Sequence, residues 1–160
     1  MRVRSRTEAD EAAVYAFLTA HGSRRVARLD RLEDALAHPA LVAENDDGSI
    51  AGILTYVVDG ESCEILTLHA AERWRGAGSA LIAAVETLAA ERACARLWVL
   101  TTNDNLDALR FYQRRGFRLA RLRAGAVDDA RRTLKPEIPV AGDHGIRIRD
   151  ELILEKEVPL

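Results

Sequence analysis

The stretch that most constrains this chain runs from Arg73 to Leu81 and reads Arg-Trp-Arg-Gly-Ala-Gly-Ser-Ala-Leu. It follows an apolar run, Ile65 to Leu68, and precedes an amphipathic run that reaches Leu88. This order predicts a strand, a short basic loop with two glycines, and the first turn of a helix. Glycines let a ligand approach the backbone, and a helix start offers unpaired N–H groups and the positive end of its dipole. The stretch therefore predicts an anion site, most naturally for a phosphate or pyrophosphate.

Composition places the chain among globular proteins. With 160 residues, 48% hydrophobic and 30% charged, it is expected to form a single domain over residues 1–160. The net charge of −2, with both signs spread along the chain, gives no reason to expect a nucleic-acid partner.

The two cysteines, Cys63 and Cys94, sit in apolar segments without metal-type partners, so we expect reduced, packed thiols, no metal and a cytoplasmic location. Met1 precedes charged residues rather than a signal-peptide core, and no apolar run is long enough to span a bilayer, so no membrane partner is expected.

Hydrophobic periodicity and turn signals divide the chain into alternating elements. The predicted strands are Arg2–Arg6, Leu41–Glu44, Ile50–Val58, Glu64–His69, Leu97–Leu100, Phe117–Leu122 and Asp150–Glu157. The predicted helices are one from Thr7 to His21, a shorter one over Leu29–Leu36, one from about Ser79 to Arg92, one from Asn105 to Arg115, and one over Val127–Leu134.

The helix between strands Glu64–His69 and Leu97–Leu100 makes a crossover, so these two strands should be parallel. The strands before them are joined by tight turns and should be antiparallel. The predicted fold class is therefore α/β (α+β), with a mixed, mostly antiparallel central sheet, one parallel pair, and helices on both faces.

Two other phosphate-binding motifs fit the glycine loop poorly. A P-loop would end in Gly-Lys-Ser/Thr, and no lysine stands here. A dinucleotide-binding fold would need a third glycine where Leu81 stands and an acidic residue at the end of the next strand, which instead ends in Leu100-Thr101-Thr102.

The pattern Arg73-x-x-Gly76-x-Gly78 resembles the Arg/Gln-x-x-Gly-x-Gly/Ala signature of the GNAT superfamily of acyltransferases. A second pattern lies further on: Asn105, Ala108 and Tyr112 have the i, i+3, i+7 spacing that shares one helix face. It resembles the GNAT helix that lines the cofactor arm and turns a tyrosine toward the sulfur. Together the two patterns extend the resemblance over about residues 2–122.

The resemblance implies that acetyl-CoA is the cosubstrate and that the parallel strands splay apart at their ends to admit it. The pantetheine arm would bond to backbone around Leu68, His69 and Ala70. The pyrophosphate would lie on N–H groups of the basic loop and helix start. The implied cofactor-binding residues are Leu68, His69, Ala70, Arg73, Arg75, Gly76, Ala77, Gly78, Ser79, Asn105 and Ala108, with Tyr112 catalytic.

The resemblance further implies transfer of an acetyl group to a primary amine by direct attack. Tyr112, with an ordinary pKa of about 10, could protonate the departing thiolate. Glu64, His69 or a water could take the proton of the amine. The acceptor is expected to be a small molecule or a peptide, and a homodimer is left open. Two alternatives also stay open: an acyl-CoA-binding sensor or partner module without turnover, and transfer of a longer acyl group.

The chain departs from a compact GNAT pattern between about residues 124 and 149. This insertion precedes the last strand and contains Pro136 and Pro139 together with apolar anchors such as Ile138 and Ile146. Long loops in compact domains are usually functional or disordered, and the anchors favour an ordered flap. We expect it to cover the acceptor site or a dimer interface, or to be a surface excursion.

Overall fold

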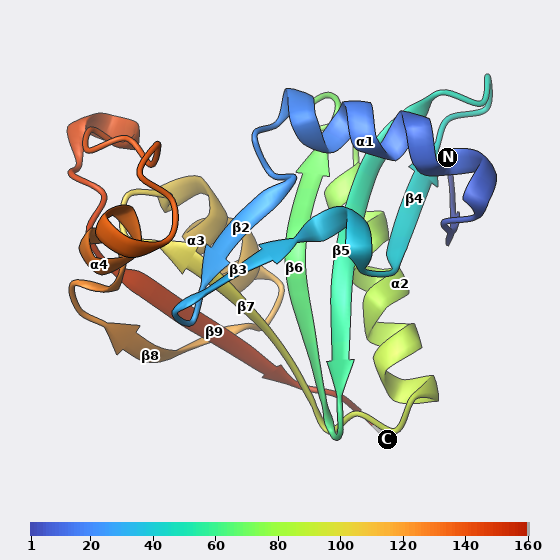
Figure 1. Cartoon of the computed structure of the whole chain (residues 1–160). Helices are drawn as coiled ribbons and strands as arrows, with labels where there is room; N and C mark the ends of the chain where they lie inside the picture. Colours follow the sequence, from blue (N-terminus) through green and yellow to red (C-terminus); the bar gives the residue numbers. More distant parts are fainter. Residues whose placement is uncertain (160) are drawn as a thin grey trace. The chain divides into compact units, whose positions relative to one another are not determined.

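The structure, a computed structural model, describes residues 1–159, and the chain forms two compact units. Unit 1 comprises residues 1–26 and 34–97 together with the chain from Val158, and unit 2 comprises residues 27–33 and 98–157. The elements are shown in Figure 1. Those of unit 1 are β1 (Arg2–Ser5), the 3-10 helix η1 (Glu8–Asp10), α1 (Glu11–Ala20), the 3-10 helix η2 (Ala35–Ala37), β4 (Ala40–Glu44), β5 (Ile50–Asp59), β6 (Ser62–Ala70) and α2 (Ala77–Glu91).

The remaining elements belong wholly or mainly to unit 2. They are β7 (Arg96–Thr102), whose first two residues belong to unit 1, α3 (Leu106–Arg114), β8 (Arg118–Arg123), α4 (Ala126–Thr133), the 3-10 helix η3 (Asp143–Gly145) and β9 (Glu151–Glu157). A hairpin of β2 (Arg25–Arg28) and β3 (Arg31–Asp34) carries the chain from unit 1 into unit 2 and back.

The sheet of unit 1 runs β1-β4-β5-β6, and every neighbouring pair is antiparallel. Helix α1 lies on one face, because its Val14 and Leu18 share a buried cluster with Ile53 of β5. Helix α2 lies on the other face, because a Cβ at the neighbouring Gly52 would point at Leu81. The prediction of helices on both faces holds for this unit, as Figure 1 also shows.

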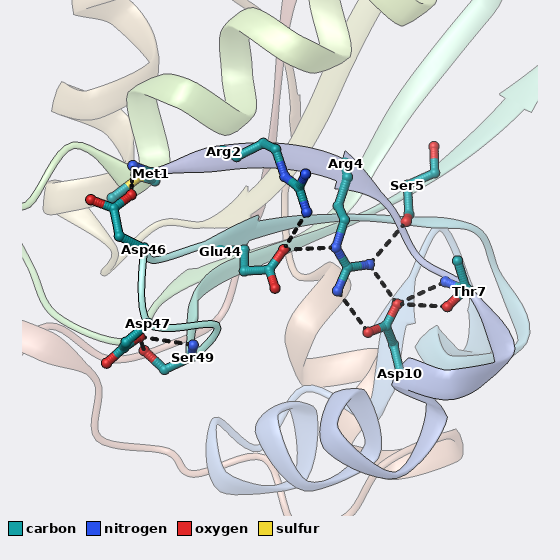
Figure 2. A network of polar contacts seen from close by, with 10 residues as sticks. All are labelled: Met1, Arg2, Arg4, Ser5, Thr7, Asp10, Glu44, Asp46, Asp47 and Ser49. Atoms are coloured by element: carbon teal, nitrogen blue, oxygen red, sulfur yellow. Dashed lines mark hydrogen bonds and ion pairs between the residues drawn. The ribbon is translucent and has the colours of Figure 1, made fainter.

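A network of charged side chains ties β1 to its surroundings (Figure 2). The guanidinium of Arg4 donates to Asp10 at 2.7 Å and to Glu44 of β4 at 2.9 Å. The carboxylate of Asp10 also accepts the backbone N–H of Thr7 at 2.8 Å. These hydrogen bonds, chiefly that from Arg4, hold the pKa of Asp10 well below its usual range. The predicted helix start at Thr7 is thus correct, although the first turn is the 3-10 helix η1.

The predicted short helix over Leu29–Leu36 is wrong, because this segment forms the β2–β3 hairpin and one 3-10 turn. Leu29 and Asp30 at the hairpin tip have φ of +47° and +62°, as the two central residues of a tight hairpin turn require. Contacts remote in sequence hold the tip: Arg123 donates to Asp30 at 2.9 Å. A helical spacing of a few leucines cannot outweigh such tertiary contacts.

In unit 2, β7, β9 and β8 are neighbours in that order. Strands β8 and β9 are antiparallel, with Arg118 opposite Glu155 and Arg123 opposite Glu151. The other predicted elements are found within a few residues of their expected bounds, including α4. Cys63 and Cys94 are free and fully buried, as expected, and burial raises the pKa of both thiols.

Candidate acetyl-CoA site

The predicted cofactor arm site on β6 is formed by the last three residues of the strand. Leu68, His69 and Ala70 are half-buried and lie opposite Leu54, Ile53 and Gly52 of β5, in that order. The ladder continues one step further, where the N–H of Ala71 donates to Ala51 O at 2.8 Å. The end of β6 is therefore held in a fixed register up to the start of the basic loop.

The basic loop leads from β6 into α2. Its side chains at Arg73, Trp74 and Arg75 are exposed, and Arg75 forms an ion pair with Glu72 at 3.1 Å. Trp74 and Gly76 both have positive φ, +65° and +86°. Gly76 is the N-cap residue of α2, and the first bond back into the helix runs from Ala80 N to Gly76 O at 3.0 Å. The N–H groups of the first turn thus have no partner within the helix, which is the arrangement that anions prefer.

A glycine on the neighbouring strand brings the helix start close to the end of β6. A Cβ at Gly52 would lie 2.9 Å from His69 O and 3.3 Å from Ala77 Cβ, closer than normal contacts. Only a residue without a side chain allows the first turn of α2 to approach the last residues of β6 this closely. Nothing in the sequence near Gly52 signals this contact, so a role for Gly52 emerges only from the fold.

His69 belongs to a cluster that the sequence analysis did not anticipate. Its Nε2 lies 2.5 Å from Ser23 Oγ, and its ring stacks on His21, with the ring centroids 4.8 Å apart. His21 in turn stacks on Phe17 of α1, at 4.3 Å. Burial, with a smaller contribution from His21, lowers the pKa of His69 to about 4, so its imidazole is neutral at neutral pH. The only local signal at Ser23 is the turn residue Gly22 before it, which says nothing of His69.

Glu64, the other candidate base on β6, is 3% exposed and lies opposite Val57. His69 is the fifth residue after it along the strand, which is about 16 Å of extended chain. The two side chains therefore cannot act on the same proton directly. Of the two, only His69 belongs to the part of β6 predicted to hold the cofactor arm.

The second half of the predicted site lies in unit 2, on α3. Asn105 is the N-cap of this helix rather than a member of it, and its Oδ1 accepts the N–H of Ala108 at 3.1 Å. Tyr112 is 6% exposed, and its ring makes edge contacts with Phe111 and Phe117 at about the centroid distances typical of aromatic pairs. Burial raises the pKa of the Tyr112 phenol, which is therefore protonated throughout the physiological range.

The insertion is fastened to the loop that precedes Asn105. Asn103 Oδ1 accepts the N–H groups of Arg149 and Asp150, each at 3.0 Å. Asp104, 5% exposed, accepts the N–H of Asp143 at 3.0 Å and the hydroxyl of Thr102 at 2.6 Å. The insertion is thus a segment of unit 2 that is held in place by hydrogen bonds, and its role as a flap stays a prediction.

One arginine of α4 holds the insertion together internally. The guanidinium of Arg131 donates to the backbone carbonyls of Ile138, Pro139 and Ile148, each at 2.9 Å. These carbonyls have no strand or helix partner, so the side chain replaces secondary structure as their donor.

Among residues 1–159, no helix is long and apolar enough to cross a membrane. In the same range, no group of three or more His, Cys, Asp or Glu side chains is placed to hold a metal ion.

Comparison with known proteins identifies the family. Residues 8–117 match the model of the acetyltransferase (GNAT) family. The chain is 46% identical to the uncharacterized Bacillus subtilis protein YxbD over 114 residues, 71% of either chain, and 45% identical to YdhI of the same organism over 116 residues, 72% of either chain. It is 39% identical over 93 residues to a mycothiol acetyltransferase of Clavibacter sepedonicus, covering 56% of this chain and 31% of that protein. The chain belongs to the GNAT acetyltransferase family.

Solved structures agree on the fold. A GNAT acetyltransferase from Elizabethkingia anophelis with acetyl-CoA bound has a TM-score of 0.70 at 19% identity, covering 98% of this chain and 97% of that one. A Bacillus subtilis acetyltransferase in complex with CoA has a TM-score of 0.69 at 16% identity, covering 99% of both chains. The fold class predicted from the sequence is thereby confirmed. The individual site residues and the single-domain organisation stay predictions.

Proposed function

We propose that this protein transfers an acetyl group from acetyl-CoA to a primary amine. The observation that carries the proposal is the exposed Arg73–Gly76 loop, which joins the end of β6 to the uncapped first turn of α2. Cations, glycine and first-turn N–H groups together suit a pyrophosphate. They stand at the positions where the family signature places them, and solved neighbours of the same fold contain acetyl-CoA or CoA.

In the proposed donor complex, the pyrophosphate lies on the N–H groups from Arg75 to Ser79, and the pantetheine arm bonds to the backbone of Leu68–Ala70. Asn105 and Ala108 line the arm from α3. A backbone N–H in the Leu68–Ala70 segment could polarise the thioester carbonyl, as an oxyanion hole does.

In the proposed reaction, the neutral amine attacks the thioester carbonyl carbon. A C–N bond forms, the C–S bond breaks, and the amine loses one proton. His69 is the better candidate to accept that proton, directly or through a water, because it is neutral and lies on the proposed arm segment. Because its pKa is low, His69 is a weak base. It is suited to accept the proton of the amine briefly and then to release it.

Tyr112 is proposed to supply the proton that the departing CoA thiolate needs. A buried phenol with a raised pKa is always protonated at neutral pH, so it is always ready to donate. The same raised pKa makes it a weaker acid than a free tyrosine. Its contribution should therefore be moderate.

The test is incubation of the purified protein with acetyl-CoA and a panel of primary amines: a polyamine, an amino acid, an aminoglycoside and a peptide with a free N-terminus. Release of free thiol that depends on one amine, with the mass of that amine increased by one acetyl group, supports the proposal. Tight binding of acetyl-CoA by calorimetry without thiol release for any amine would favour the binding module. Faster release with longer acyl-CoA thioesters would reassign the donor.

The names of solved neighbours span several classes of acceptor. Solved neighbours of the same fold include a ribosomal-protein-alanine N-acetyltransferase, a nourseothricin acetyltransferase and a putative phosphinothricin N-acetyltransferase. Their names cover a protein, an antibiotic and a small amino compound, so the fold by itself selects no acceptor.

A further inference from the structure

One side chain of the basic loop is unexplained by the pyrophosphate site. Trp74 is 83% exposed, which makes it the most exposed large hydrophobic side chain among the described residues. Exposed aromatic surface of this size is unfavourable in water, and in folded proteins it often marks a binding surface. A phosphate gains nothing from an indole, so Trp74 needs a different ligand group.

The backbone conformation of Trp74 is also unfavourable. Trp74 has a φ of +65°, a left-handed conformation that suits glycine and is strained for a bulky side chain. A glycine at this position would relieve the strain and remove the exposed ring. A residue whose backbone conformation and exposed apolar surface are both unfavourable is expected to be kept for a function.

The neighbours of Trp74 indicate the ligand. The exposed cations Arg73 and Arg75 flank it, and Gly76, two residues on, begins the first turn of α2. A flat aromatic face suits a nucleobase, while cations and backbone N–H groups suit phosphates. Ala77 is the third residue after Trp74, so the indole and the phosphate cradle lie within about 10 Å along the chain. A nucleotide whose diphosphate lies at the helix start is long enough to bring its base to the indole.

We propose that Trp74 stacks on the adenine ring of the CoA donor, and that the loop thereby favours a donor that carries the nucleotide over a bare pantetheine thioester. The proposal rests on acetyl-CoA being the donor. The ion pair of Arg75 with Glu72 is compatible with it, because a pair this exposed is easily exchanged for a phosphate contact.

The test compares two donors that carry the same thioester, acetyl-CoA and S-acetylpantetheine, the latter without any nucleotide. The variant of choice is Trp74→Gly, since glycine accepts the left-handed backbone and only the ring is lost. We expect kcat/KM for acetyl-CoA to fall about 5- to 100-fold, the range that base stacking on an aromatic residue supplies. The value for S-acetylpantetheine should change far less, and Trp74→Phe should keep most of the preference for acetyl-CoA.

The matched control is Leu119→Ala, which removes another strongly exposed hydrophobic side chain, 56% exposed on β8. It should leave the ratio of the two donors as in the wild type. An equal fall with both donors in Trp74→Gly, or no fall with either, would overturn the stacking proposal.

Fluorescence gives a readout that does not require turnover. The chain has two tryptophans, and Trp98 is only 8% exposed, so Trp74 should dominate the response to a ligand at the surface. Adenosine 3′,5′-bisphosphate should quench the wild type, and pantetheine should not. The Trp74→Phe variant should lose this quenching.

The two proposals fail in different ways. If the wild type binds CoA with quenching but turns over no amine, the transferase function fails and the stacking stands. If amines are acetylated while adenosine 3′,5′-bisphosphate neither quenches nor competes with acetyl-CoA, the stacking fails and the function stands.

Discussion

His69 is a residue of the candidate site whose acid–base behaviour departs strongly from that of a free imidazole. Its pKa of about 4 follows chiefly from burial and secondarily from the neighbouring His21. The hydrogen bond with Ser23 and the ring stack on His21 fix its position, and His21 also contributes to its low pKa, so a contact that makes it a weak base also holds it at the end of β6. Stability and the proposed proton transfer are therefore linked at one side chain.

The lowered pKa predicts a pH dependence of stability. Between pH 6.5 and about pH 4, an imidazole in the unfolded chain binds a proton that folded His69 does not. The free energy of unfolding should therefore fall as the pH is lowered through this window, by at most about 3 kcal/mol from this group. Urea unfolding at pH 7, 5.5 and 4.5 should show a smaller fall for His69→Gln than for the wild type. The exposed His144→Gln should keep the wild-type fall, and equal falls in both variants would contradict the assignment.

Tyr112→Phe tests the proposed proton donor. The variant keeps the ring and its contacts with Phe111 and Phe117, so folding and acetyl-CoA affinity should change little. We expect kcat to fall about 10- to 100-fold, the lower end of what general acids contribute, because a thiolate is a fair leaving group. Tyr56→Phe, a buried tyrosine of β5, is the matched control. An unchanged kcat across the pH range would remove Tyr112 from the chemistry.

At the scale of elements, the candidate donor site depends on how closely α2 approaches β6. The helix begins one residue after Gly76, and its first turn packs over Gly52 of β5 beside the carbonyl of His69. Strand end, loop and helix start thus form one rigid connection, although the loop itself is exposed. Donor affinity should then respond to changes in β5 that touch no ligand.

Gly52→Ala puts this dependence to the test. The new Cβ would meet backbone and side-chain atoms at 2.9 to 3.3 Å, so the helix start must shift. We expect a loss of about 1–3 kcal/mol in stability and a weaker Kd for acetyl-CoA. Ala84→Gly, in the middle of α2, should cost about 1 kcal/mol without moving the first turn. Calorimetric Kd values that weaken equally in both variants would show a general stability effect instead.

At the scale of the whole molecule, the insertion is the part that distinguishes this chain from a compact GNAT pattern. Its hydrogen bonds to Asn103 and Asp104 place it directly against the loop that leads to Asn105. We propose that it shapes the acceptor side of the site. A purely peripheral segment would not need a buried anchor such as Asp104 in the loop that precedes the helix proposed to contact the cofactor arm.

Two variants test whether the insertion shapes the acceptor side of the site or is only peripheral. Deleting Ala126–Gly145 removes the donor of the hydrogen bond to buried Asp104, so a loss of stability of about 1–3 kcal/mol is expected together with a loss of amine acetylation. Asp143→Pro removes the N–H in question together with an exposed carboxylate, at a position where a short helix tolerates proline. It should raise KM for the amine while KM for acetyl-CoA stays unchanged. Full acetylation by the deletion protein would exclude the role.

The sequence predicted the parts of the fold that neighbouring residues decide. The tight turns between the antiparallel strands, the helix that ends near Arg115 and the strand–loop–helix around Gly76 all follow from local signals, and each is found within a few residues of where it is expected. The hairpin over residues 25–34 was missed because its tip is held by Arg123 and Glu151, far along the chain. Leucines at helical spacing therefore led to the wrong prediction of a helix over Leu29–Leu36.

What the sequence determined by itself is the family and the position of the glycine loop between β6 and α2, because both rest on residue types at short, fixed spacings. Tertiary structure alone decided that Ser23 bonds to His69, that Gly52 admits the start of α2, that Tyr112 is buried, and that Asn103 and Asp104 hold the insertion. Each of these depends on which distant residues meet, and burial and packing set the pKa values and close contacts that follow. The spacing of residues along the sequence does not show which distant residues come into contact.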